Sequence, residues 1–174
     1  MILSVEEFKK HVATDIDDLV LESKLQALEM LIRKYTNNNF QNRRIRSVCE
    51  SYGGNSLIGI SPYIRAGDTV QLSESINEGV CVVKSVDGIT AIVDKDLISE
   101  KSVLVTKIEY PVDIKLGVIN MMKWEIENRD KVGIQSETIS RHSVTYFNMD
   151  GNNSIMGFPK SLLGFLKPYK KARF

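Results

Sequence analysis

The sequence predicts an α+β protein: a small helical bundle built from the N- and C-terminal parts of the chain, with an inserted small antiparallel, SH3-like β-barrel module. Two observations predict this fold. Apolar residues recur at helical spacing in both terminal parts, and short Val- and Ile-rich runs separated by turn residues fill the region between them. The expected parts are the N-terminal helices of the bundle (1–43), the inserted β module (44–108), and a middle helix, β arm and basic C-terminal tail that complete the bundle (109–174).

Two helices are expected in the N-terminal part. Ser4 and Glu7 form a capping box in front of a short helix at about 5–12. A second helix should run to about Tyr35, because an apolar stripe recurs there at steps of three and four residues. The stripe consists of Leu21, Leu25, Leu28, Ile32 and Tyr35. The Asn triplet at 37–39 is expected to end this helix, since Asn tolerates left-handed and turn conformations.

The region from residue 44 changes in character and reads as a series of short strands. The expected strands are 45–52, 57–60, 68–72, 80–86, 89–93 and 103–108. Asp87-Gly88 lies between two Val/Ile runs, which is a strong signal for a two-residue hairpin turn. Several short strands joined by tight turns within this length are typical of a small barrel or sandwich.

A third helix is expected to begin at Pro111, a residue suited to the first turn of a helix. Its predicted apolar stripe consists of Val112, Leu116, Ile119, Met122 and Ile126. Trp124 lies off this stripe and is expected to cover the seam to the β module or to face another subunit. Glu125 and Glu127 are interpreted as ordinary polar-face residues.

The C-terminal part is expected to form a β arm around Ile139, Val144 and Tyr146, followed by a short helix. That helix should begin at Pro159 and stop at Lys167-Pro168. Beyond Gly151 the chain contains several cations and no Asp or Glu, and its apolar residues are too few for a core of their own. We therefore expect a neighbouring chain to complete it, although a solvated basic terminus is the alternative. The predicted partner-contact residues are Tyr146, Phe165, Leu166, Lys167, Tyr169, Lys170, Lys171, Arg173 and Phe174.

Composition and motifs argue against catalysis. A net charge of +1 gives no global argument for a nucleic-acid binder, and neither a signal peptide nor a membrane-spanning stretch is visible. His11 and His142 have no partner at ligand or triad spacing. The aspartates at 15, 17 and 18 are interpreted as stabilising charges at a helix start. Cys49 and Cys81 are expected to be reduced, partly buried thiols. The sequence thus predicts a protein that is not an enzyme, with no catalytic residue, cofactor or metal.

Three segments carry a resemblance to a known family. Residues 19–40, LVLESKLQALEMLIRKYTNNNF, form a long amphipathic helix that closes on Tyr-Thr and then Phe. Residues 136–146, SETISRHSVTY, are followed by Gly157-Phe-Pro and by LKPYKKARF at 166–174. These segments resemble the opening helix and the C-terminal block of head–tail connector (adaptor or head-completion) proteins from tailed phages and prophages of Firmicutes, and 111–128 matches their middle helix in character. The resemblance covers roughly half of the chain, and the β region 44–108 departs from the shortest, mainly helical members.

The resemblance implies a virion structural protein that binds the portal as an oligomeric ring, typically of twelve subunits, and extends the DNA channel to the tail. Its partners would be further copies of itself, the portal protein, and a head-closure or tail protein. Genomic DNA would pass without sequence-specific binding, and no membrane would be involved. The protein would be found in the virion neck, and in the cytoplasm of the bacterial host before assembly.

Two alternatives remain open. The first is a nucleic-acid-binding module built on the β barrel, which the many acids of that region oppose. These are Asp68, Glu74, Glu78, Asp87, Asp94, Asp96 and Glu100. The second is another neck component, such as a head-closure or tail-completion protein, which would share the assembly logic but bind a different neighbour.

Overall fold

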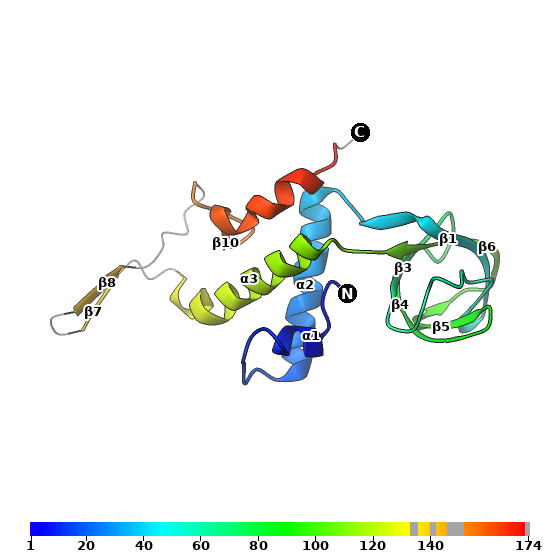
Figure 1. Cartoon of the computed structure of the whole chain (residues 1–174), viewed down its shortest axis with the longest axis horizontal. Helices are drawn as coiled ribbons and strands as arrows, with labels where there is room; N and C mark the ends of the chain where they lie inside the picture. Colours follow the sequence, from blue (N-terminus) through cyan, green and yellow to red (C-terminus); the bar gives the residue numbers. More distant parts are fainter. Residues whose placement is uncertain (133–135, 140–141, 146–151, 173–174) are drawn as a thin grey trace. The chain divides into compact units, whose positions relative to one another are not determined.

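The computed structural model describes residues 1–132, 136–139, 142–145 and 152–172. The chain divides into two compact units. The barrel unit consists of Met1 and Asn39–Tyr110, and the helical unit consists of Ile2–Asn38 and Pro111–Phe174. Helices and a closed antiparallel barrel occur in one chain (Figure 1), which confirms the predicted α+β class with an antiparallel barrel.

The barrel unit is a closed sheet of six strands (Figure 1). They are β1 (Gln41–Tyr52), β2 (Gly54–Ile58), β3 (Thr69–Ser73), β4 (Gly79–Asp87), β5 (Thr90–Leu97) and β6 (Glu100–Ile108). Each overlaps one of the predicted strands. Their order around the barrel is β1-β2-β5-β4-β3-β6, and every neighbouring pair is antiparallel. Closure leaves no sheet edge unpaired, which removes the usual site of unwanted strand addition.

Alternation along the strands fills the barrel interior with small and branched apolar residues. Cys81 and Val83 of β4 and Ala91 and Val93 of β5 are buried, whereas the residues between them are only partly so. The predicted hairpin is present, because Asp87 pairs with Thr90 across a turn in which Gly88 has φ 57°.

Both cysteines lie inside the barrel and carry free thiols, as predicted. They are fully rather than partly buried. Burial raises the pKa of Cys81 to about 12 and also raises the pKa of Cys49.

Capping residues define the ends of the two N-terminal helices of the helical unit. The capping box between Ser4 and Glu7 is confirmed at the start of α1 (Val5–Lys9), which is shorter than predicted. Asp17 caps α2 (Asp18–Thr36) by accepting a hydrogen bond from the Leu19 amide, and Asn37 ends it in the left-handed conformation (φ 49°, ψ 37°). The predicted α2 stripe is buried from Leu21 to Ile32, and Tyr35 is half-buried.

The third helix begins after Pro111 as expected, but the predicted apolar stripe is wrong in part. In α3 (Val112–Asn128), Val112 is 72% exposed and Leu116 is 52% exposed. The buried face contains Ile114, Gly117, Val118, Ile119, Met121 and Met122. Apolar residues surround most of this helix, so spacing alone allowed two faces, and packing against the C-terminal segment selects the one containing Gly117.

Within the described residues, Phe158, Leu163 and Leu166 of the C-terminal segment are buried in the core of the helical unit, so the expectation that this segment cannot bury itself is wrong. After 3₁₀ turn η1 (Arg129–Lys131) and the hairpin strands β7 (Ser136–Ile139) and β8 (His142–Thr145), a small hairpin forms from β9 (Ser154–Ile155) and β10 (Phe158–Pro159). It leads into the 3₁₀ helix η2 (Lys160–Tyr169), which contacts α3 and α2 (Figure 1). Leu163 and Leu166 of η2 are buried there.

The final helix also differs from expectation in its type and its end. Pro168 lies inside η2, and the helix continues to Tyr169 instead of stopping at Lys167-Pro168. Because proline has no backbone N–H, the last turn of η2 lacks the hydrogen bond that residue 168 would otherwise donate. Within the residues that the structure describes, no helix has the length and hydropathy to cross a membrane.

Candidate functional site

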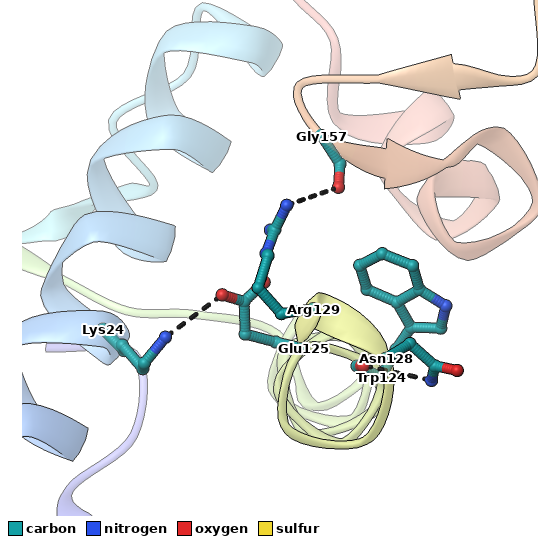
Figure 2. Close-up of polar contacts among 6 residues, drawn as sticks. All are labelled: Lys24, Trp124, Glu125, Asn128, Arg129 and Gly157. Atoms are coloured by element: carbon teal, nitrogen blue, oxygen red, sulfur yellow. Dashed lines mark hydrogen bonds and ion pairs between the residues drawn. The ribbon is translucent and has the colours of Figure 1, made fainter. Parts of the chain in front are cut away.

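Arg129 is the centre of a polar cluster in the helical unit, at the end of α3. Its Nε donates to Glu125 Oε2 at 2.8 Å, and its second terminal nitrogen also contacts that carboxylate. Another guanidinium nitrogen donates to the Gly157 carbonyl at 3.3 Å. Figure 2 shows Arg129 between Glu125 on α3 and Gly157 in the β9–β10 turn. One planar cation therefore joins two segments that are distant in sequence.

Glu125 receives a second cation from α2. Figure 2 shows the contact between Lys24 and Glu125. Lys24 Nζ lies 3.1 Å from Glu125 Oε1, and only 12% of the Glu125 side chain is exposed. Burial acts to raise the pKa of Glu125, but hydrogen bonds and charge from Arg129 and Lys24 outweigh it, so that the pKa is lowered. The carboxylate stays ionised at neutral pH and joins α2 to α3. The interpretation of Glu125 as an ordinary polar-face residue is therefore wrong.

Two aromatic rings pack beside the Arg129 guanidinium. The ring centroids of Trp124 and Phe158 are 5.5 Å apart, and the guanidinium carbon lies 5.6 Å and 5.3 Å from them, respectively. These distances are within the range of cation–π contacts. Trp124 thus packs on Phe158 of β10 within its own unit. This location is neither the seam to the β module nor the contact with another subunit that the sequence suggested.

The β9–β10 turn has an unusual residue at its tip. Met156 and Gly157 both have positive φ, at 56° and 77°, as in a two-residue type I′ hairpin turn. Gly suits such a position, whereas a bulky unbranched residue such as Met rarely adopts it. A Cβ at Gly157 would lie 3.3 Å from an Arg129 nitrogen, so glycine leaves room for the guanidinium. Backbone strain of this kind tends to persist where it supports a functional arrangement.

The Met156 side chain helps to line a groove of about 190 Å³ between α2, α3 and the turn. The lining residues are Lys24, Ala27, Leu28, Leu31, Met122, Glu125, Arg129, Met156 and Phe158. An apolar cavity slightly smaller than this, about 150 Å³, holds a benzene-sized group. The groove can therefore accept one apolar side chain, and the cations at its border can bind a neighbouring carbonyl or carboxylate. Methionine adapts well to varied apolar contacts.

The predicted partner-contact residues are divided between core and surface. Phe165 packs against Gly117 of α3, and Leu166 is fully buried, so these two side chains serve the chain's own core. Tyr169 donates its hydroxyl to Asp113, with O–O distances of 2.7 and 2.8 Å. Tyr146, Arg173 and Phe174 lie outside the described residues.

The predicted cations Lys167, Lys170 and Lys171 are exposed. Lys170 Nζ lies 3.8 Å from the centroid of the Tyr35 ring, and the Lys171 amide donates to the Thr36 carbonyl at 2.8 Å. The tail is thus fixed on the end of α2 by the Lys171 backbone and the Lys170 side chain, while Lys167 and Lys171 are exposed.

The histidines and the other titratable residues considered in the sequence form no common site within the described part of the chain. His11 is exposed after α1, and His142 lies in β8. No group of His, Cys, Asp and Glu in that part of the chain could hold a metal ion.

Sequence reasoning missed the Arg129 cluster and its groove. One signal was available, because Glu125 and Arg129 are spaced i, i+4, which places both on one face of a helix. The contribution of Lys24, and that of the turn at Met156, depends on packing between distant segments and has no local pattern.

In comparisons with known proteins, no protein-family model matches the chain and no curated protein matches its sequence.

Proposed function

We propose that this chain is a virion structural protein of a tailed phage or prophage, a head–tail connector that binds the portal as an oligomeric ring and extends the DNA channel toward the tail. Its partners are other copies of the chain, the portal protein and the next neck component, with genomic DNA passing through without sequence-specific contacts. It acts in the virion neck and performs no catalysis.

One observation carries this proposal. The segments that resemble the connector family, 19–40, 111–128 and the C-terminal block, fall almost entirely in the helical unit, whereas the region that departs from the family forms the barrel unit. Three separate segments that resemble the same family would be expected to belong to one folded unit if the resemblance reflects a shared fold. Within this proposal, the helical unit is the bundle of the family, and the barrel is an SH3-like insertion.

Two features of the helical unit suit contact with other subunits. Strands β7 and β8 pair antiparallel in a two-stranded sheet of their own. A lone hairpin is marginally stable in water, so it gains from docking on a neighbour. The groove beside Arg129 offers a receptor for a single apolar side chain. A ring needs two different complementary surfaces on each subunit, and the hairpin and groove are candidates for them.

The test is to mix the purified chain with the portal ring of the same phage or prophage and to image the mixture by electron microscopy. An added ring of density on the portal is expected. A Lys167→Glu, Lys171→Glu variant should reduce portal occupancy, because both side chains are exposed and the buried tail contacts remain. A Lys123→Glu variant on α3 is the matched surface control. Absence of added density for the unaltered chain across a range of salt concentrations would refute the proposal.

A nucleic-acid-binding barrel is the second candidate, favoured by exposed Arg43, Arg44 and Arg46 on β1. It predicts DNA binding that weakens steeply with salt. The acids on the same barrel oppose it, so we rank it below the connector. Another neck component, such as a head-closure or tail-completion protein, would bind the particle without binding an isolated portal.

A further inference from the structure

The barrel has two chemically different ends. Because its strands alternate in direction, the ends of β1, β3 and β5 meet the starts of β2, β4 and β6 at one end of the barrel. The opposite ends of the same strands meet at the other. We call these the acidic end and the basic end, after the charged residues that each contains.

Acids outnumber cations at the acidic end. Its charged residues are Glu50, Glu74, Glu78, Asp94, Asp96 and Glu100, with Lys95 and Lys101. Buried Asn77 fixes the loops there, because its side-chain amide donates to the Ile98 carbonyl and accepts from the Ile98 amide, at 2.8 and 2.7 Å. On this ordered base, Ile98 is 63% exposed, and Ile76 and Tyr52 also expose more than half of their surface.

Cations outnumber acids at the basic end. Its charged residues are Arg43, Arg44, Arg46, Arg65, Lys84 and Lys107, with Asp68, Asp87 and Glu109. This end is also ordered, since Lys107 forms an ion pair with Asp68 at 2.7 Å and donates to the Tyr63 carbonyl. The amides of residues 59 and 60 donate to the Ile89 carbonyl. Ile89 is 63% exposed, and Tyr63 also exposes more than half of its surface.

We propose that the barrel is a head-to-tail contact module, in which the acidic end of one copy docks on the basic end of the next copy. Each end combines exposed apolar side chains with a surrounding charge of one sign, which is the composition of a docking surface with a polar rim. The charges of the two ends are complementary, and like ends would repel each other. Contact between two different surfaces generates rings or filaments rather than a closed pair.

The occupant of each end is therefore a second copy of this chain. The inference rests on the proposed ring, to which it adds a function for the barrel, but its test uses the full chain alone. Failure of the barrel contact is thus distinguishable from failure to bind the portal.

Disulfide cross-linking tests the direction of the contact. One sample carries Ile98→Cys at the acidic end, and a second, size-tagged sample carries Ile89→Cys at the basic end. Both positions are exposed, while the native Cys49 and Cys81 are buried and do not compete. On oxidation of the mixture at low salt, the mixed dimer should exceed either homodimer by roughly tenfold, because like ends repel.

The matched control mixes the tagged Ile89→Cys sample with Glu127→Cys, at an exposed position on α3. A mixed dimer no more abundant than in this control, at any salt concentration, overturns the proposal. Homodimers that predominate would also overturn it, since they would indicate a symmetric contact.

Charge reversal tests the cause of the preference. Adding Glu78→Lys and Asp96→Lys to the Ile98→Cys sample should abolish the excess of mixed dimer, and adding Arg44→Glu and Arg46→Glu to the other sample should then restore it. Glu127→Lys should have no effect. Unchanged cross-linking after the reversal would contradict the proposal. Salt-dependent binding of duplex DNA that is lost with the arginine reversal, in the absence of the mixed dimer, would assign the basic end to nucleic acid and would overturn it as well.

Discussion

The barrel unit and the helical unit are stabilised in different ways. The barrel is one continuous stretch of chain, closed by backbone pairing between neighbouring strands, with a core of small and branched side chains. The helical unit joins both terminal parts of the chain, and a few side-chain contacts hold the parts together. Among these are the ion pair between Lys24 and Glu125 and the contact of the Lys170 ammonium with the Tyr35 ring. We therefore expect single substitutions in α3 and η2 to lower the unfolding free energy of the helical unit more than single substitutions in the barrel lower that of the barrel unit.

The largest effect is expected for Leu166→Ala, because Leu166 is fully buried in the helical unit. Truncating such a leucine costs about 2–5 kcal/mol of unfolding free energy. Urea unfolding followed by the fluorescence of Trp124, the single tryptophan, reports on this unit, and labelling of Cys49 and Cys81 reports on the barrel. The fluorescence transition should shift without a change in labelling. Lys167→Ala, at the exposed neighbouring position, is the control and should cost less than about 0.5 kcal/mol.

Gly117→Ala should have the next largest effect. A Cβ at Gly117 would come within 2.2 Å of the Phe165 ring, so the ring must move. Overpacking of this kind typically costs about 1–3 kcal/mol. The same fluorescence transition measures the loss. Combining the change with Phe165→Leu should recover part of it, whereas strictly additive losses would show that the two residues do not interact.

The Glu125 cluster should make the stability of the helical unit depend on pH. The pKa of Glu125 is lower in the folded chain, so its contribution is present above the unfolded-state pKa and is lost as pH falls through the folded-state pKa. When the unfolding free energy is measured against pH by Trp124 fluorescence, Glu125→Gln should reduce the fall in stability on the acid side (the acid limb of the profile). Glu127→Gln, on the exposed side of α3, should leave that limb unchanged. If the two variants showed the same loss of stability at acid pH, Glu125 would not be the source of the pH dependence.

The smallest effect is expected for Leu116→Ala, at a position that the structure leaves more than half exposed. Such surface substitutions usually change stability by less than about 0.5 kcal/mol. Ile114→Ala, on the buried face of the same helix, should cost about 2–5 kcal/mol. If thermal or urea unfolding ranked the two in the reverse order, the assignment of the buried face of α3 would be wrong.

The sequence predicted the barrel better than the helical unit, for a physical reason. Strand alternation and the Asp87-Gly88 turn are local signals, so six strands and one hairpin could be located from neighbouring residues alone. The face of α3 and the burial of Leu166 depend on which distant segment packs where, and the apolar residues around α3 fit two solutions. The groove was also beyond prediction, because Lys24, Arg129 and Met156 come from three separate segments.

The most direct test of the account is to remove the barrel. The Phe40 carbonyl accepts a hydrogen bond from the Glu109 amide at 2.9 Å, so a short Gly-Ser link can replace residues 41–108. If the helical unit carries portal attachment, the shortened chain should unfold cooperatively by Trp124 fluorescence and should still bind the portal ring, although without the contacts between barrels. A shortened chain that folds but does not bind, beside a full chain that binds, would contradict the central claim and would assign portal attachment to the barrel.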